Sequence, residues 1–482
     1  MPMTKTQDEQ RRDLLKKAQE VIGIPMSSID KTGRLQSGKG AIGTVIEESW
    51  FGYKPNSESE PDFPEAGLEL KVTPYIRRGR EIRAKERLVC NIINYMTEHL
   101  KTFETSDFWK KCNTLLIMSY EHRFNIEKGK FTIDNAVIFG FPSEDLAIII
   151  QDWNKIIAKI REGKAHLLTE GDTLYLAACT KGKDSSSVRK QPFSDIPAKS
   201  RAYSLKSSYM TMILNDYIFG HKKDEHIIKD WKQLIHKKFE DLIIEKIKPY
   251  YGLTRSELSK KFGIDSNSKN IYSILLARML GINGEVNNTS EFKSANIIAK
   301  TIRVQRNGRI KESMSFPTFD FRKIVNETWE TSELREMLEP TKFMFVIFNE
   351  QSEDEYVLDR VKFWNIPMQD LDEVRKVWER TVGILKEGVQ LIYNGKVIHN
   401  NLPKMTENRV AHVRPHARNA EDTCFLPDGR KMTKQCFWLN NSYVASVINC
   451  ELIEYQTGYD QSEYTSMVAE NASEYNTNND ES

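Results

Sequence analysis

The spacing of apolar residues predicts helices near the start of the chain and strands soon after. Thr6–Ile22 and Gly40–Trp50 carry apolar residues every three or four positions, as amphipathic helices do, and Gly52 supplies a stop. From Gly67 to Thr73 apolar and polar residues alternate, which predicts a half-buried strand. Later patterns predict strands at Thr114–Tyr120 and Ala136–Phe141 and helices at Leu146–Arg161 and Asp224–Ile247. The chain is therefore expected to have a mixed α/β fold.

The chain repeats its own pattern, which decides the expected number of domains. An aromatic-Glu-Thr-Ser tetrapeptide at 103–106 recurs at 329–332, and an apolar strand follows each copy. Further pairs occur in the same order in both halves: Lys85-Glu86 with Lys311-Glu312, Trp153 with Trp378, Glu162-Gly163 with Glu387-Gly388, and Leu205–Tyr209 with Leu439–Tyr443. We expect one copy at residues 1–225, a second at 226–455 and a tail at 456–482.

Composition favours a globular protein with an acidic end. The 482 residues are 29% charged and 39% hydrophobic, which suits more than one packed core. From Glu451 to Ser482 there are eight acids and no Lys or Arg, so a net charge of +2 for the whole chain leaves +10 on the preceding residues. A basic body favours a polyanionic partner, although many enzymes share this balance. The Asn-, Ser- and Glu-rich tail is predicted to be disordered.

Cysteine usage and hydropathy exclude several classes. The six cysteines form no CxxC and no Cys/His zinc spacing, so we expect reduced structural cysteines. No apolar run approaches the roughly 20 residues that a membrane span needs. The polar start of the chain does not resemble a secretory signal. We expect a cytoplasmic protein without a membrane partner.

One strand carries a pattern that suits metal-dependent hydrolysis. Asp62 stands seven residues before Glu69, and Lys71 shares a strand face with Glu69. Paired carboxylates hold hard divalent cations, and a neighbouring lysine can orient or activate the attacking water. This is the chemistry of metal-dependent nucleases acting on phosphodiesters. The alternative is that the Glu-x-Lys strand is a solvated face.

A longer stretch around this strand resembles the MutH family of mismatch-repair endonucleases. The resemblance rests on Gly38–Gly43, Trp50-Phe51-Gly52 and the run from Asp62 to Lys71, and continues through Phe103–Ser106 and Tyr203–Tyr209. The two-copy length, with Lys85–Tyr95 and Cys179–Gly182, is more similar to the Sau-type restriction endonucleases of the same family. The resemblance implies two tandem copies of a restriction-endonuclease-like, MutH-like fold.

The family also implies a function. It predicts a type II restriction endonuclease that uses Mg²⁺ to cut both strands of duplex DNA at GATC, 5′ of the G, beside a cognate DNA methyltransferase in a bacterial cytoplasm. One active site per chain then requires a dimer on DNA or two successive cuts. A MutH-like nicking enzyme and a non-catalytic DNA-binding regulator are the alternatives.

The resemblance assigns residues in the first copy. Asp62 and Glu69 become metal ligands and Lys71 the catalytic lysine. The family has a further Glu on the preceding helix. Counting from Gly43 selects Glu47, whereas counting back from Trp50 selects Glu48, as if one residue were inserted. We favour Glu48, which lies nearer the apolar side of the predicted helix.

Further lysines of the first copy are candidates for contact with DNA. Lys39, just before the helix, suits a phosphate, although it could equally be an ordinary surface lysine. Lys181 matches the last residue of the family's Arg-Pro-Lys base-reading segment, whereas Cys179 and Thr180 depart from it. Lys206 matches a lysine near the active site.

The second copy lacks the catalytic pattern. Aligning Lys300 with Lys71 puts Glu291 at Asp62 and the hydrocarbon Ile298 at Glu69, and Ala277 falls opposite Glu48. Arg414-Pro415 nevertheless retains the Arg-Pro of the base-reading segment, and Arg can bind guanine O6 and N7 in the major groove. We therefore expect a catalytically dead copy that binds DNA as an allosteric effector. The alternative is that Arg414 is a buried structural residue.

Overall fold

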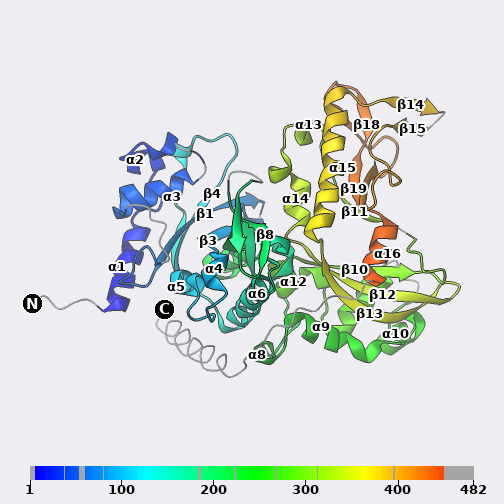
Figure 1. Cartoon of the computed structure of the whole chain (residues 1–482), viewed down its shortest axis with the longest axis horizontal. Coiled ribbons are helices and arrows are strands. Elements are labelled where there is room, and N and C mark those ends of the chain that lie inside the picture. Colours follow the sequence, from blue (N-terminus) through cyan, green and yellow to red (C-terminus); the bar gives the residue numbers. More distant parts are fainter. Residues whose placement is uncertain are drawn as a thin grey trace, which may run out of the picture. The chain divides into compact units, whose positions relative to one another are not determined.

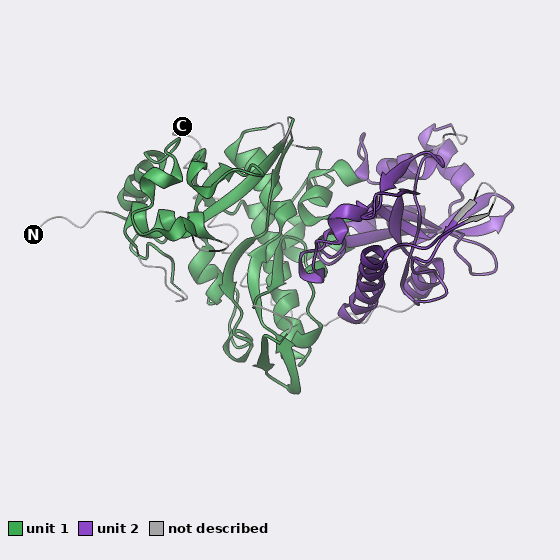
Figure 2. Cartoon of the chain, turned by 90° about the horizontal axis from the view of Figure 1, so that it is seen from above, with its two compact units in different colours: residues 1–242, 287–297, 455–482 green, residues 243–286, 298–454 purple. Residues whose placement is uncertain are grey.

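The computed structural model divides the chain into two compact units (Figure 2). It describes residues 6–36, 38, 40–53, 60–79, 81–182, 186–221, 224–265, 268, 270–311, 313–394 and 397–449. The first unit contains Met1–Leu242 and Asn287–Ile297, and the second contains Ile243–Val286 and most of the chain from Ile298. The division thus comes later than the expected boundary at 225/226. Lys39 and the predicted acidic tail at 456–482 lie outside the described residues.

The first unit begins with helices that cover one face of a sheet (Figure 1). Thr6 caps the first helix through a capping box with Glu9. The Thr6 hydroxyl accepts a hydrogen bond from the Glu9 amide, and the Glu9 carboxylate accepts one from the Thr6 amide. Apolar side chains from these helices and from one face of the neighbouring strands form one core. The elements are α1 (Gln7–Gln19), α2 (Met26–Ile29), α3 (Ala41–Val45), the π-helical turn η2 (Ile46–Phe51), β1 (Glu69–Arg78), β2 (Glu81–Ala84), β4 (Thr114–Glu121) and β5 (Asn135–Gly140).

The sheet of the first unit has the order β2-β1-β4-β5. β1 runs parallel to β4, with Glu69 beside Leu115 and Lys71 beside Ile117, whereas its pairing with β2 is antiparallel. Leu68 and Leu70 are buried as the alternation predicted, but Glu69 on the opposite face is only 2% exposed. The strand is therefore covered on both faces, and its charged side chains are enclosed rather than solvated.

A second, smaller sheet completes the first unit. Its order is β3-β9-β6, and α6 packs against β6. The predicted helix Leu146–Arg161 is confirmed as the body of α6. The further elements are β3 (Leu88–Ile92), α4 (Tyr95–Glu98), α5 (Asp107–Cys112), α6 (Ser143–Arg161), β6 (Leu176–Thr180), β7 (Val188–Gln191), β8 (Ser194–Lys199), β9 (Arg201–Leu205) and α7 (Ser207–Met212).

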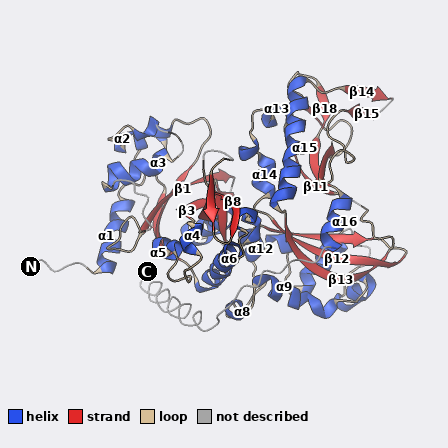
Figure 3. Ribbon diagram, in the orientation of Figure 1, coloured by secondary structure: helices blue, strands red, loops and turns tan. Residues whose placement is uncertain are grey.

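The second unit repeats this arrangement (Figure 3). Its sheets have the orders β10-β12-β13 and β11-β19-β16, which correspond to β1-β4-β5 and β3-β9-β6. The helix α15 takes the place of α6, between β13 and β16 in the chain. The elements are α11 (Ile271–Met279), β10 (Ile297–Val304), β11 (Met314–Thr318), α13 (Phe321–Ile324), α14 (Glu333–Leu338), β12 (Lys342–Ser352), β13 (Glu355–Asn365), α15 (Met368–Glu387), β16 (Ala411–Pro415), β19 (Gln435–Leu439) and α16 (Asn441–Asn449). The short helix α12 (Ser290–Ala295), which precedes β10 in the chain, belongs to the first unit.

Individual contacts recur at matched positions of the two units. The Tyr209 hydroxyl donates to Asp145 at 3.0 Å, and the Tyr443 hydroxyl donates to Asp370 at 2.7 Å. The ring centroids of Phe103 and Trp153 lie 5.9 Å apart, and those of Trp329 and Trp378 lie 5.8 Å apart. Ser106 and Ser332 each cap the helix that follows the Glu-Thr-Ser motif. The predicted internal repeat is therefore confirmed in topology and in side-chain contacts.

The predicted helix at Asp224–Ile247 is only partly correct. Residues 224–232 are not helical, and the helical parts are α8 (Gln233–His236) and α9 (Phe239–Ile247). The backbone amides of Ile227 and Ile228 donate to Glu291, each at 2.9 Å. Hydrogen bonds to a side chain more than sixty residues away replace those of a helix, and hydrophobic periodicity does not reveal such a contact.

The sequence predicted that the chain has no membrane-spanning helix and that its cysteines are reduced. The helices of the described residues include none that is long and apolar enough to cross a membrane. The described cysteines Cys90, Cys112, Cys179, Cys424 and Cys436 are free thiols, as expected, while Cys450 lies outside the described residues.

Candidate active site

Asp62, Glu69 and Lys71 meet where β1 begins. A tight turn, closed by backbone pairing of Phe63 with Leu68, brings Asp62 back to the strand. The Asp62 amide donates to Glu69 Oε2 at 3.1 Å, and the Leu70 amide donates to Asp62 Oδ2 at 3.0 Å. Lys71 Nζ donates to Glu69 Oε1 at 2.7 Å. The three side chains predicted from the sequence thus form one constellation.

A second lysine, Lys111, joins this constellation and was not predicted. It lies near the end of α5, is 8% exposed, and its Nζ is 3.7 Å from Glu69 Oε1. The internal repeat contained a signal for it. Lys111 follows the first Glu-Thr-Ser motif at the same distance at which Met337 follows the second. The substitution accompanies the loss of the other charged site residues from the second copy.

Burial and mutual repulsion perturb the carboxyl groups of the site. Burial raises the pKa of Glu69, and the Lys71 ammonium opposes this rise. Burial, followed by repulsion from Asp62, raises the pKa of Glu47 to about 7. Burial alone would lower the pKa of Lys71, but the Glu69 carboxylate raises it. Clustered perturbed carboxyl groups of this kind are typical of functional sites.

The structure corrects the choice between the two helical acids. Glu47 interacts electrostatically with Asp62, Glu69 and Lys71. Glu48 instead accepts two hydrogen bonds from Arg34, at 2.8 and 2.9 Å, which lower its pKa. The predicted inward position of Glu48 is therefore wrong, and Glu47 occupies it.

A π-helical turn explains why counting along the helix gave two answers. The helix α3 continues as η2, a π-helical turn over Ile46–Phe51 that ends at Gly52, whose φ is +81°. A π turn places one more residue in a helical turn than an α turn does. Counting from Gly43 runs through α3 and enters only the start of η2, and it selects Glu47. Counting back from Trp50 crosses the wider turn and is one residue out of phase.

The carboxylates suit a hard divalent cation. Within the described ranges no cluster of three or more His, Cys, Asp or Glu is arranged to hold a metal. Mg²⁺ is usually bound through one or two carboxylates, with water and substrate phosphate completing its shell. Asp62 and Glu69, with Glu47 close enough to repel them, provide oxygen donors whose repulsion a divalent cation would relieve. The donor set therefore fits Mg²⁺.

Two of the predicted DNA-contacting lysines of the first copy lie in very different places. Lys181 is exposed at the end of β6, where its backbone amide pairs with Ser200. Lys206 is only 2% exposed, and its Nζ donates to the Thr173 carbonyl at 2.5 Å. In the second unit Asn440 donates to the equivalent Asn408 carbonyl at 2.7 Å. The structure thus corrects the DNA-binding prediction for Lys206, which holds main chain in the interior of the unit.

The second unit has no counterpart of the carboxylate pair among its described residues. Glu291 belongs to α12, which packs in the first unit, where Glu291 accepts amides of the 227–228 segment. Ile298 is half-buried and Lys300 is exposed on β10, while Ala277 is buried in α11. The Glu291 carboxylate is thus engaged by backbone amides, and the other three positions carry no carboxylate.

Arg414 lies on the surface of the second unit. Strand register places Arg414 at the position of Cys179. Ala411 pairs with Leu439 in the second unit as Leu176 pairs with Leu205 in the first, and Arg414 and Cys179 each follow three residues later. Its guanidinium carbon lies 4.3 Å from the centroid of the Trp438 ring, and the adjacent Pro415 is also exposed. The alternative of a buried structural arginine is therefore wrong. An exposed guanidinium stacked on an aromatic ring is held in place yet keeps donors free for a ligand.

Comparisons with known proteins agree with this architecture. The profile of the family described as DNA mismatch repair enzyme MutH matches twice, at residues 51–152 and 280–376. The type II restriction enzyme Sau3AI of Staphylococcus aureus is 36% identical over 470 residues, covering 89% of this chain and 96% of that protein. The DNA mismatch repair protein MutH of Shewanella woodyi is 30% identical over 182 residues, covering 36% of this chain and 77% of that protein. The chain therefore belongs to the MutH and Sau3AI family of site-specific deoxyribonucleases and carries its restriction-endonuclease-like fold in two tandem copies.

Proposed function

We propose that the protein is a type II restriction endonuclease that cuts both strands of duplex DNA at GATC, 5′ of the G, with Mg²⁺. The observation that carries this proposal is the Asp62–Glu69 carboxylate pair with Lys71 hydrogen-bonded to it. The match to a type II restriction enzyme over nearly its whole length supports the restriction role. A cognate methyltransferase would protect the host's own GATC sites in the bacterial cytoplasm.

The chain's own residues have distinct roles in this proposal. Asp62 and Glu69 would hold Mg²⁺, which supplies a Lewis acid that offsets charge developing on the phosphodiester. Lys71 lies against Glu69 and orients the attacking water beside the scissile phosphate. Lys111, from α5, opposes the rise that burial causes in the pKa of Glu69 and so stabilises its carboxylate form.

Incubation of a supercoiled plasmid with the purified protein and Mg²⁺ tests the proposal. A plasmid with one GATC site should become linear, and EDTA should prevent the reaction. Open circles that persist would instead indicate a nicking enzyme like the MutH relatives. An intact plasmid that is nevertheless bound would indicate a regulator without catalysis.

The two lysines are expected to differ in their effect on cleavage. Lys71→Ala should slow cleavage by at least about a hundredfold, because positioned groups that assist proton transfer contribute roughly 10²–10⁴-fold. Lys111→Met, which copies the second unit, should slow it less, by roughly tenfold, since Lys111 acts only through Glu69. Single-turnover rates on a short GATC duplex measure both effects. The exposed lysine variant Lys110→Ala is the matched control, and normal cleavage by Lys71→Ala would contradict the assignment.

We propose that the second unit binds a further recognition site and activates the first unit as an effector. The exposed Arg414 stacked on Trp438 supports this role, because such an arginine can read guanine in the major groove. An effector of this kind must bind DNA with different affinity in the active and inactive states. Two chains could then pair on DNA, one cutting each strand.

Arg414→Ala is expected to weaken DNA binding and to reduce the preference for two-site plasmids. A bidentate arginine–guanine contact contributes roughly 1–3 kcal/mol of discrimination. Cleavage of one-site and two-site plasmids, with and without added GATC oligonucleotide, measures the effect. Arg375→Ala, which removes an arginine paired with Glu379 on α15, is the control. Equal rates on both plasmids, unchanged by Arg414→Ala, would show that the second unit is not an effector.

A further inference from the structure

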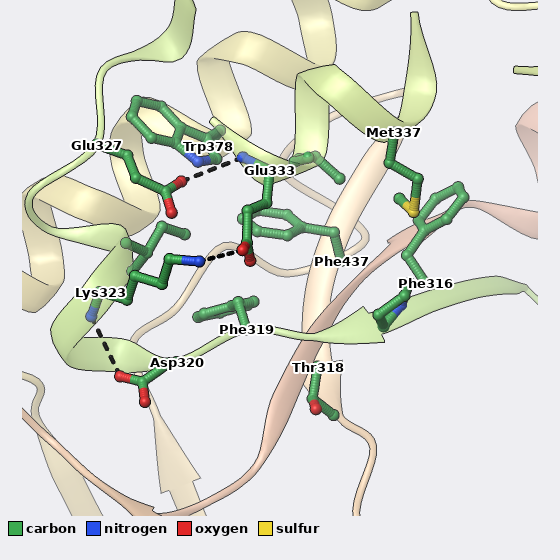
Figure 4. A pocket seen from close by; sticks show the side chains of 13 residues that line it. Phe316, Thr318, Phe319, Asp320, Lys323, Glu327, Glu333, Met337, Trp378 and Phe437 are labelled. Carbon is green, nitrogen blue, oxygen red and sulfur yellow. Dashed lines mark hydrogen bonds and ion pairs between the residues drawn. The ribbon is translucent and has the colours of Figure 1, made fainter. Parts of the chain in front are cut away.

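A hollow in the second unit is lined by aromatic, aliphatic and charged side chains (Figure 4). It lies among β11, α13, α14 and α15, and Phe319, Trp378 and Phe437 form much of its wall. Its volume is about 230 Å³, several times the roughly 30 Å³ that one water takes up in the liquid. The hollow thus has room for a group larger than a single solvent molecule.

The corresponding region of the first unit contains a polar network. There the Tyr203 hydroxyl approaches Glu98 Oε1 at 3.4 Å, and Lys101 bonds Glu98 at 3.0 Å and Asp107 at 2.5 Å. Glu98 is fully buried. The helix caps and strand registers place Phe437 at the position of Tyr203 and Ile324 at that of Glu98. The second unit has therefore lost the hydroxyl and the carboxylate from this region.

The indole N–H of Trp378 lies beside the hollow. Trp378 is 4% exposed, and no described residue accepts a hydrogen bond from its Nε1. Figure 4 shows this nitrogen on the edge of the ring that faces Glu327 and Glu333. Its counterpart Trp153 also lacks a hydrogen bond of normal geometry. Trp153 nevertheless lies near the Tyr203 hydroxyl, because it opposes the rise that burial causes in the pKa of Tyr203. A buried donor without an acceptor is costly, so an acceptor on a bound molecule would satisfy Trp378.

Charged side chains define the second requirement on a ligand. Asp320, Glu327 and Glu333 line the hollow with one lysine, Lys323, which is ion-paired with Glu333. Three carboxylates against one ammonium disfavour a phosphate-bearing ligand and favour donors on a neutral or cationic one. A simple ammonium ion would suit the carboxylates and the rings, but it offers no acceptor for Trp378.

We propose that the hollow binds a nucleobase, most favourably that of a nucleoside without phosphate. A nucleobase has a flat face for Phe319, Trp378 and Phe437, an acceptor for the indole N–H and amino or imino donors for the carboxylates. The same chemistry could come from a free nucleoside or from an unpaired base in DNA. The carboxylates at the hollow favour the free nucleoside, because they repel a phosphate backbone.

Calorimetric titration of the full chain without Mg²⁺ tests this site independently of cleavage. The probes are adenosine, guanosine, cytidine and thymidine, their 5′-monophosphates, and a duplex with or without one unpaired base. We expect saturable binding of at least one nucleoside, tighter than that of its monophosphate. Tighter binding of the duplex with the unpaired base, lost in Phe437→Tyr, would assign the nucleobase to DNA.

Two substitutions distinguish this site from adventitious binding. Trp378→Phe removes the donor and keeps a ring, and Phe437→Tyr supplies the hydroxyl present in the first unit. Each should weaken nucleoside binding by at least about tenfold, whereas Trp364→Phe, a core change elsewhere in the unit, should not. Thermal melting verifies that the variants fold. The proposal would be overturned by absence of nucleobase binding, by wild-type affinity in both variants, or by monophosphates that bind as tightly as nucleosides.

Discussion

Replacing Asp62 by asparagine is expected to lower the cleavage rate by at least about a hundredfold, the scale on which loss of one transition-state stabilising group acts. The amide keeps an oxygen that can accept the Leu70 N–H, so the turn before β1 should persist. It loses the negative charge that would hold Mg²⁺ and offset charge at the phosphodiester. Glu69→Gln should behave in the same way. Single-turnover cleavage of a GATC duplex at saturating Mg²⁺ measures both effects.

Binding and stability separate a catalytic loss from a folding defect. Both variants should bind the duplex with nearly unchanged affinity when Mg²⁺ is absent, because neither substitution removes a positively charged side chain that could contact a phosphate. Glu65→Gln, an exposed acid in the same turn, is the matched control and should cleave normally. A melting temperature near that of the wild type would show that the fold is kept. Cleavage by Asp62→Asn at the wild-type rate would contradict the assignment of the metal site to β1.

Local patterns in the sequence predicted the elements around this site because one has an alternating apolar face and the other is a continuous apolar run. The alternation from Gly67 to Thr73 and the run at Thr114–Tyr120 correspond to β1 and β4. The internal repeat was also visible, since the Glu-Thr-Ser turn and the tryptophans of α6 and α15 recur in register. Such features depend on near neighbours in the chain, which a sequence displays directly.

The errors arose where distant residues decide the environment. Lys206 was expected to contact DNA, but a carbonyl at Thr173 retains it in the interior. Lys111 was missed because a lysine on a short helix has no periodic signal; comparison with Met337 of the second copy marks the position, and the contact with Glu69 across two elements shows its role. The segment before α8 is held by Glu291 from a distant part of the chain. Long-range polar contacts of this kind leave no trace in the spacing of apolar residues.

The two neighbouring acids of the π-helical turn η2 should respond oppositely to the same conservative change. Glu47→Gln is expected to slow cleavage by at least about a hundredfold, because it removes a charge that interacts with Asp62, Glu69 and Lys71. Glu48→Gln should change the rate by no more than roughly twofold. Its ion pair with Arg34 lies away from the site, and such pairs near the surface contribute little to stability.

The comparison is sharp because the variants are otherwise alike. Each exchanges a carboxylate for an amide of equal length on the same turn, so helix propensity and net charge change equally. Rates measured over a series of Mg²⁺ concentrations show whether Glu47 acts through the metal. If it does, the loss of cleavage rate in Glu47→Gln should shrink as the Mg²⁺ concentration rises. If Glu47 acts on the water instead, the loss of rate should stay the same. An inactive Glu48→Gln beside a normal Glu47→Gln would mean that the helix shifts by one residue when DNA and metal bind, turning the Arg34 partner inward.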